Sequence, residues 1–465
     1  MQNYNKKLSI NLSCLLLAGL LVTTKLFSVD SEPAIWTPVT AMQQAIETNP
    51  SILEARAQFE RQTGVLIHVR STMLPTAEIV GSANTRDRSL IDTAPSRQTL
   101  TPAQQTTTSV SEKSYNVGLE FRQLVFDGFT AFNQYREHKY LKDASYWNLV
   151  NVTYRILSLV QQAYDGILMN KAMVEIHRQS VETFRKIALI NEKRAAVGDV
   201  TSLDGLRVNS ELKRAEADLA AAQSALVRSE EEFRKLLQIP VDSANERPVF
   251  AEGVLEQRYF LMTPEEALKR AEALQPEIIS ARKDVHAAKM RVYSAQGNYL
   301  PKIDAFAKYN MQSSFYDFDK TLDGWILGIQ GRWTLFDSFG REGTVKADKA
   351  SLRASRIRLE DKRYQIASQV RELYAQMDAI RQSIESQREA VRFGAQSVRE
   401  GERLYAVGMA GIEILLDAEL SLRRSQIDLQ ARIFENNRFV YELEYVIGTQ
   451  WVDPFLIKGT VAKSK

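Results

Sequence analysis

The chain has 465 residues, of which 44% are hydrophobic and 25% charged, a composition typical of a folded protein and incompatible with wholesale disorder. Its 60 basic and 57 acidic residues give a formal net charge of +3 and are spread along the sequence. This near balance argues against a nucleic-acid-binding surface.

The N-terminus gives the first indication of location. Two lysines precede an apolar run over residues 8–22, which is short for a membrane-spanning helix and typical of an export signal. We therefore expect residues 1–30 to be a signal peptide, with an approximate end. The chain's one cysteine, Cys14, falls inside this run, so the mature chain should contain neither disulfides nor thiolate metal sites.

Two internal matches indicate that the rest of the chain is duplicated. Ala196-Val197-Gly198 matches Ala406-Val407-Gly408 at an offset of about 210 residues, and Leu74-Pro75 matches Leu300-Pro301 at about 226. Because the offsets differ by about 16 residues, the first copy should carry an insertion of that size, which we place in the polar run 86–113.

The matches predict how the mature chain is divided. A first structural repeat should occupy residues 31–250, a second repeat 251–448, and a C-terminal tail 449–465. Within the first copy, a short helix is expected at 37–48 and a longer one from Pro50 to about residue 73, since proline is tolerated in a first helical turn.

A strict alternation of apolar and polar residues predicts two strands in each copy. The four expected strands are 76–84, 114–125, 302–312 and 324–335. In the second strand Tyr115 begins the apolar face, and in the fourth Trp325 and Trp333 lie near the two ends of it. Such a band suits a strand of a transmembrane β-barrel with a polar interior, although a soluble β-sandwich would also produce the alternation.

Four strands cannot close a barrel, and open sheet edges are not tolerated in lipid. If the strands lie in a membrane, closure therefore requires other chains, and three copies would supply twelve strands. A trimer is thus inferred from the strand count together with the membrane hypothesis.

After the second strand of each copy the sequence predicts a long helical hairpin. Asp127 and Asp337 can cap the first helix of each hairpin. The longest helical pattern runs over 339–447 and is broken at 407–411, where two glycines allow the chain to reverse. At ~1.5 Å per residue, the roughly 68 residues before Gly408 would span about 100 Å.

Both hairpins carry the four-three spacing of a coiled-coil seam with polar interruptions. The apolar positions of the second seam are Leu415, Leu422, Leu429, Ile433, Val440, Leu443 and Ile447. The polar positions are Glu419, Gln426 and Asn436, and in the first copy Asn170 and His177. We interpret His177 as a seam or solvated residue rather than a ligand.

No enzymatic signature is found in the sequence. It contains no phosphate-binding glycine loop, no GxSxG, no HExxH and no metal-spaced cysteine-histidine set. We therefore expect a protein that is not an enzyme and needs no cofactor or metal.

The signal, the duplicated order of elements and the paired glycine tips together resemble the TolC-type outer-membrane efflux channels, over roughly residues 37–448. The resemblance implies a mainly α fold with a small membrane β-barrel: a homotrimer whose twelve-stranded barrel in the outer membrane continues into a periplasmic α-helical tunnel. It also implies two partners, a periplasmic adaptor protein and an inner-membrane pump or ABC transporter.

The resemblance further implies which residues carry the function. The hairpin tips at Val197, Gly198, Val407 and Gly408 would dock the adaptor, and Trp325, Trp333 and Tyr115 would lie at the membrane interface. Asp417 and Asp204 match positions at which the family narrows the tunnel with acidic residues. Three copies of Asp417 would form a ring around the axis.

The tip also departs from the family pattern. Ile414 and Ala410 occupy positions that are often acidic and basic in the family, which puts its gating latch in doubt. The alternative role of Asp204 and Asp417 is that of a first-turn carboxylate stabilised by the helix dipole.

The predicted function is therefore a passive outer-membrane conduit of a tripartite efflux or type I secretion system, gated at the periplasmic tips. The alternative is a periplasmic or peripheral coiled-coil scaffold without a pore, which explains the seams but not the strands. The lack of a convincing lipoprotein cysteine weakly favours the secretion branch, while the cargo stays open.

Overall fold

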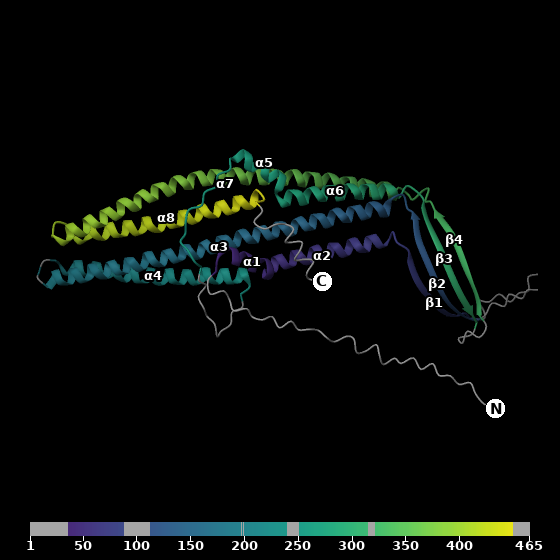
Figure 1. Cartoon of the computed structure of the whole chain (residues 1–465), viewed down its shortest axis with the longest axis horizontal. Helices are drawn as coiled ribbons and strands as arrows, with labels where there is room; N and C mark the ends of the chain where they lie inside the picture. Colours follow the sequence, from purple (N-terminus) through teal and green to yellow (C-terminus); the bar gives the residue numbers. More distant parts are fainter. Residues whose placement is uncertain are drawn as a thin grey trace, which may run out of the picture.

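The computed structural model shows an elongated body in which long helices lie side by side and a four-stranded sheet forms one end (Figure 1). The residues that it describes are 36–87, 112–196, 198, 200–239, 251–314 and 321–449. The predicted signal peptide, most of the predicted insertion and the C-terminal tail beyond residue 449 lie outside these ranges.

The order of elements repeats as the sequence predicts. The first copy consists of α1 (Pro38–Thr48), α2 (Pro50–Ser71), β1 (Thr76–Thr85), β2 (Lys113–Phe126), α3 (Thr130–Ala196) and α4 (Ser202–Leu237). The second copy consists of α5 (Pro264–Leu274), α6 (Pro276–Gly297), β3 (Lys302–Ser313), β4 (Thr321–Arg332), α7 (Gly340–Ala406) and α8 (Ile412–Val446). Helices α3 and α7 both contain 67 residues, so the two hairpins have matched lengths.

Local hydrogen bonds explain where the helices begin. Thr37 and Thr263 each form a capping box at the start of a short helix that has proline in its first turn. The predicted caps after the strands are confirmed: the amide of Ala131 donates to Asp127 over 2.7 Å, and the amide of Arg341 donates to Asp337 over 2.9 Å.

Each hairpin tip turns at one glycine, whereas two were expected in the second tip. Gly198 and Gly408 have φ angles of +80° and +74°, which are left-handed conformations that glycine adopts without strain. Gly411 does not contribute to the reversal in this way, because it has an extended conformation and is the residue that precedes the first turn of α8.

The sheet is antiparallel in the order β1-β2-β3-β4, and its register separates two faces. On one face Leu119 lies opposite Ile79 and Tyr309, and Tyr309 lies opposite Trp325. On the other face Lys308 Nζ lies 2.9 Å from the carboxylate of Glu120. Within the described residues, neither the outer edge of β1 nor that of β4 has a strand partner.

The fourth strand is displaced from its predicted bounds of 324–335. It runs from Thr321 to Arg332, so Trp333 lies just beyond its end. The physical reason is that the indole of Trp333 donates a hydrogen bond to the carbonyl of Tyr299 over 3.1 Å, which fixes it at the junction with the helices. The prediction that Trp333 is a strand residue was wrong.

The segment that joins the two copies is tied to α8 by side-chain amides. Asn437 donates to the carbonyl of Glu256 and Asn436 to the carbonyl of Arg258, over 2.8 and 2.9 Å. Asn437 also donates to the buried carboxylate of Asp165 on α3. The polar seam residue Asn436 therefore binds the segment that joins the two copies. Burial raises the pKa of Asp165 above its usual range.

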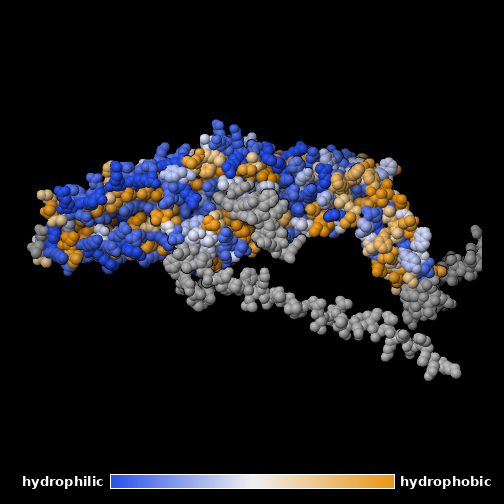
Figure 2. All heavy atoms as spheres, in the orientation of Figure 1, coloured by the Kyte–Doolittle hydropathy of each residue, from blue (hydrophilic) through white to orange (hydrophobic). Residues whose placement is uncertain are grey.

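The apolar core follows the helix contacts in patches rather than forming one centre. The largest patch lies where α1, α3 and α4 meet and includes Tyr154 and Phe233, and a second joins α5, α7 and α8. The outer surface of the helices is mostly hydrophilic, whereas orange patches continue over the sheet (Figure 2). No helix within the described ranges is both long and apolar enough to cross a membrane.

The sheet and the helices meet at a contact between two glycines. Gly128 has a φ of +70°, and a Cβ atom on it would overlap the carbonyl of Gly297 at the end of α6. A Cβ atom on Gly297 would in turn lie 2.5 Å from the carbonyl oxygen of Gly128. The junction therefore depends on the absence of both side chains.

We predict that Gly128→Ala lowers the free energy of unfolding by about 2–4 kcal/mol, because it adds a left-handed non-glycine residue and a backbone overlap. Gly343→Ala is the matched control, since nothing lies within 4 Å of a Cβ atom there. Thermal unfolding followed by circular dichroism measures both variants. Equal effects of the two substitutions would contradict this account of the junction.

Candidate functional site at the helical tips

The two hairpins run side by side away from the sheet, and their tips lie at the opposite end of the molecule (Figure 1). Hairpin α3/α4 contacts hairpin α7/α8 mainly through α3 and α8. Near the tips a separate apolar cluster joins the two hairpins and includes Phe184, Val208, Ile412 and Leu415. Burial of these side chains holds the tips together in this conformation.

A polar contact reinforces the apolar one. Arg194 of α3 donates to the carbonyl of Tyr405 on α7 over 2.8 Å, and its guanidinium lies 4.6 Å from the centre of the Tyr405 ring. The Tyr405 hydroxyl is 3.0 Å from the Asn191 side-chain oxygen, to which it donates. Tyr405 itself is 3% exposed, so this contact is shielded from water.

The contact between Arg194 and Tyr405 is not evident from the sequence. Arg194 and Tyr405 lie just before the two matched AVG tips, and an aromatic residue three positions before the glycine of a turn is the local signal. The pairing depends on how the two hairpins are aligned with each other. The apolar spacing within one hairpin does not give that alignment.

The two predicted pore carboxylates have different environments. Asp204 completes the capping box of α4: the Thr201 hydroxyl donates to it over 2.8 Å, and the Asp204 amide returns a bond to that hydroxyl. The hydroxyl bond holds the pKa of Asp204 below its usual range. Asp417 is exposed on α8 and one turn from the exposed Ile414. That either carboxylate lines a pore stays a prediction.

The residues predicted to dock an adaptor are partly described. Val407 is 63% exposed, and Gly408 forms the turn beside it, so the second tip presents apolar surface together with Met409. In the first tip Gly198 forms the turn, and Val197 lies outside the described residues. The docking role of these residues stays a prediction.

The predicted interface aromatics lie on the apolar face of the sheet or next to it. Trp325 is 76% exposed in the single chain, and Tyr115 on β2 is half-buried. The apolar band ends beside Trp325 at Asp323, whose carboxylate accepts a hydrogen bond from the Tyr309 hydroxyl over 2.7 Å. The placement of these aromatic residues at a membrane interface stays a prediction.

The opposite face of the sheet is lined with charged groups that pair with one another. Glu120 is held between Arg122 at 2.8 Å and Lys308 at 2.9 Å. The ring of Phe306 lies over Gly328, where a Cβ atom would be 2.8 Å from the ring. This face is therefore suited to contact with water, and glycine provides the space for its one large apolar ring.

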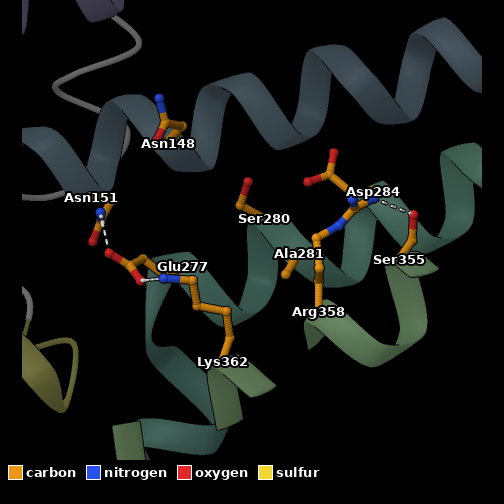
Figure 3. A pocket seen from close by; sticks show the side chains of 9 residues that line it. All are labelled: Asn148, Asn151, Glu277, Ser280, Ala281, Asp284, Ser355, Arg358 and Lys362. Carbon is orange, nitrogen blue, oxygen red and sulfur yellow. Dashed lines mark hydrogen bonds and ion pairs between the residues drawn. The ribbon is translucent and has the colours of Figure 1, made fainter. Parts of the chain in front are cut away.

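A polar pocket of about 320 Å³ lies between α3, α6 and α7 (Figure 3). Glu277 accepts a hydrogen bond from Asn151 over 3.1 Å and pairs with Lys362 at 3.2 Å, so one carboxylate ties three helices together. Arg358 donates to Ser355 on its own helix. Within the described residues, no group of three or more histidine, cysteine or acidic side chains could hold a metal ion.

Comparisons with known proteins agree on one family. The profile described as "Outer membrane efflux protein" matches residues 41–237 and 267–432. The alkaline protease secretion protein AprF of Pseudomonas aeruginosa is 23% identical over 396 residues, which cover 83% of this chain and 79% of AprF.

Solved structures show the same fold. The Campylobacter jejuni CmeC outer membrane channel has a TM-score of 0.78 at 14% identity, over 92% of this chain and 89% of CmeC. The outer membrane protein VceC of Vibrio cholerae has a TM-score of 0.74 at 18% identity, over 88% of this chain and 96% of VceC.

We predict that Tyr405→Phe, which removes the bond to Asn191, weakens the contact between the tips by about 1 kcal/mol. The amides near residues 190–196 and 405–415 should then exchange with solvent several times faster, as measured by hydrogen-exchange mass spectrometry. Tyr364→Phe is the matched control because that side chain is 76% exposed. Unchanged hydrogen exchange in Tyr405→Phe would show that the Tyr405 hydroxyl does not stabilise the contact between the tips.

Proposed function

The chain belongs to the outer membrane efflux protein family, and we propose that three copies of it form the outer-membrane conduit of an export system with three components. As a member of this family it is an outer-membrane channel that extends into the periplasm. The number of copies, the partners, the gate and the cargo are the parts that we propose.

The observation that carries the proposal is the sheet β1–β4. One face is apolar and exposed in the single chain, the other carries the paired charges around Glu120, and both edges are open in the described residues. In lipid each edge needs a strand partner, and an identical copy provides one by pairing its β1 with β4 of its neighbour. Three copies give a closed barrel of twelve strands.

The helices continue this conduit away from the membrane. In each copy α3 contacts α4 and α8, and α8 contacts α7, so the two hairpins lie side by side (Figure 1). Three such copies placed around one axis would enclose a tunnel. The chain carries no recognised energy-coupling motif, and we propose that a periplasmic adaptor and an inner-membrane pump or ABC transporter supply the energy. The exposed apolar tips around Val407 are the proposed docking surface.

Opening requires the tips to separate. We propose that the buried contact between Arg194 and Tyr405, with the apolar cluster beside it, takes the place of the family latch that Ala410 and Ile414 leave in doubt. The proposed pore ring is formed by Asp417. For cargo we propose a polypeptide, because AprF, which matches most of this chain, is an alkaline protease secretion protein.

The alternative of a scaffold without a pore is less well supported. A scaffold explains the long seams, but an exposed apolar sheet face opposite a charged face would be a liability in water. The family match favours the channel as well.

Substitutions on the two faces of β4 test the barrel. Leu327→Arg places a charge on the apolar face and should cost about 2–4 kcal/mol if that face contacts lipid, which would sharply reduce the amount of trimer in the outer membrane. Gln330→Arg on the polar face, opposite Asp304, is the matched control and should assemble normally. Membrane fractionation and heat-dependent migration in gels measure both. Equal assembly of the two variants would rule against the barrel.

Conductance in planar bilayers tests the proposed ring. We expect discrete openings from the purified protein, with a preference for cations that Asp417→Asn lowers at least twofold because it removes three charges from the axis. Asp378→Asn, whose side chain is 73% exposed on α7, should leave the preference unchanged. A protein that conducts but keeps its full preference after Asp417→Asn would show that another group selects the ions.

A further inference from the structure

Between the tips and the contact of Asn437 with Asp165, one arginine also joins the two hairpins. Arg423 of α8 donates to the Ser180 hydroxyl of α3 over 3.3 Å and lies 3.4 Å from the carboxylate of Asp218 on α4. Its side chain is only 16% exposed. A half-buried guanidinium therefore connects three helices that belong to both hairpins.

Glu419 is placed to compete for this arginine. It precedes Arg423 by one helical turn, so both side chains lie on the same face of α8. It is half-buried, and the negative charge of Glu402 on α7 is near enough to act on it. Burial, and after it the charge of Glu402, raises the pKa of Glu419 to about 7, while Arg423 opposes the rise.

The other charged groups around Arg423 are accounted for. On α3, His177 is half-buried near Asp218 and Arg423, and burial lowers its pKa below the usual range. Asp218 on α4 is the carboxylate that Arg423 already contacts. In this cluster Glu419 is the group whose pKa is raised to about 7.

We propose that Arg423 is a movable tie between the hairpins, which binds Ser180 and Asp218 when Glu419 is neutral and is drawn back along α8 when Glu419 is ionised. Ionisation of Glu419 then releases α8 from α3 and α4 and favours opening of the tips. The inference rests on the proposed gated conduit, and it adds a control by pH that the tip contact does not contain.

The direction follows from the linkage between ionisation and conformation. The raised pKa means that the closed conformation favours the protonated carboxyl, so its stability is complete below the ordinary pKa of 4.5. That stability is lost as the pH rises from 4.5 towards about 7, and the loss levels off above it. If opening hydrates Glu419, the open state gains population over the same interval.

The first test is the open probability of the full-length protein in planar bilayers at pH 5.5 and pH 8. We expect a rise of between about threefold and about 30-fold in the parent protein. Glu419→Gln, which stays neutral, should remain at the level of pH 5.5, and Arg423→Gln should be open at both pH values. His177→Gln should keep the response, and so should Glu400→Gln, a control on exposed α7. A parent-like response in Glu419→Gln would overturn the proposal.

A second readout does not require conduction. Spin labels at the exposed positions Arg178 of α3 and Arg424 of α8, with Cys14 replaced by serine, report the distance between the hairpins in detergent. The distance should increase with pH in the parent protein and stay constant in Glu419→Gln. A pH-dependent distance without conductance would support the tie and count against the conduit, whereas conductance with a distance that does not respond to pH would overturn the tie alone.

Discussion

A backbone in lipid must satisfy its own hydrogen bonds, and this chain can do so only in part. Its four strands pair with one another, but the outer edges of β1 and β4 have no partner among the described residues. Other features of the chain are those of a subunit whose sheet is completed by pairing with further copies. The apolar face of the sheet is exposed, the charged face is self-paired, and the two long hairpins lie side by side.

In the proposed conduit, contacts between the two hairpins would determine whether the tips are open or closed. Two of these contacts differ in character. At the tips, Tyr405 is buried among apolar side chains and makes a shielded contact with Arg194, which does not change its charge near neutral pH. Farther along, the Arg423 cluster is half-buried and lies next to a carboxylate that titrates. The first contact therefore depends on packing, and the second on the protonation state of one side chain.

The sequence predicted the parts of the structure that depend on local patterns. Gly198 and Gly408 identified the turns, Asp127 and Asp337 the helix starts, and the alternation around Leu119 the exposed face of β2. The sequence did not predict the contacts that depend on how distant segments are aligned in the fold. Trp333 lies outside the strand because its indole donates a hydrogen bond to the carbonyl of Tyr299. Arg194 of one hairpin donates to the carbonyl of Tyr405 in the other. The polar seam residues Asn436 and Glu419 were visible as exceptions, but their roles required knowledge of what lies opposite them.

The equal lengths of α3 and α7 have a consequence for how such a chain can change over evolutionary time. Deleting seven residues from each helix of one hairpin would shorten that hairpin by about 10 Å. The tips of the two hairpins would then no longer lie at the same level. Only matching deletions in both hairpins keep the tips at the same level. The lengths of the two hairpins can therefore change only together, although the side chains of the two repeats are free to diverge.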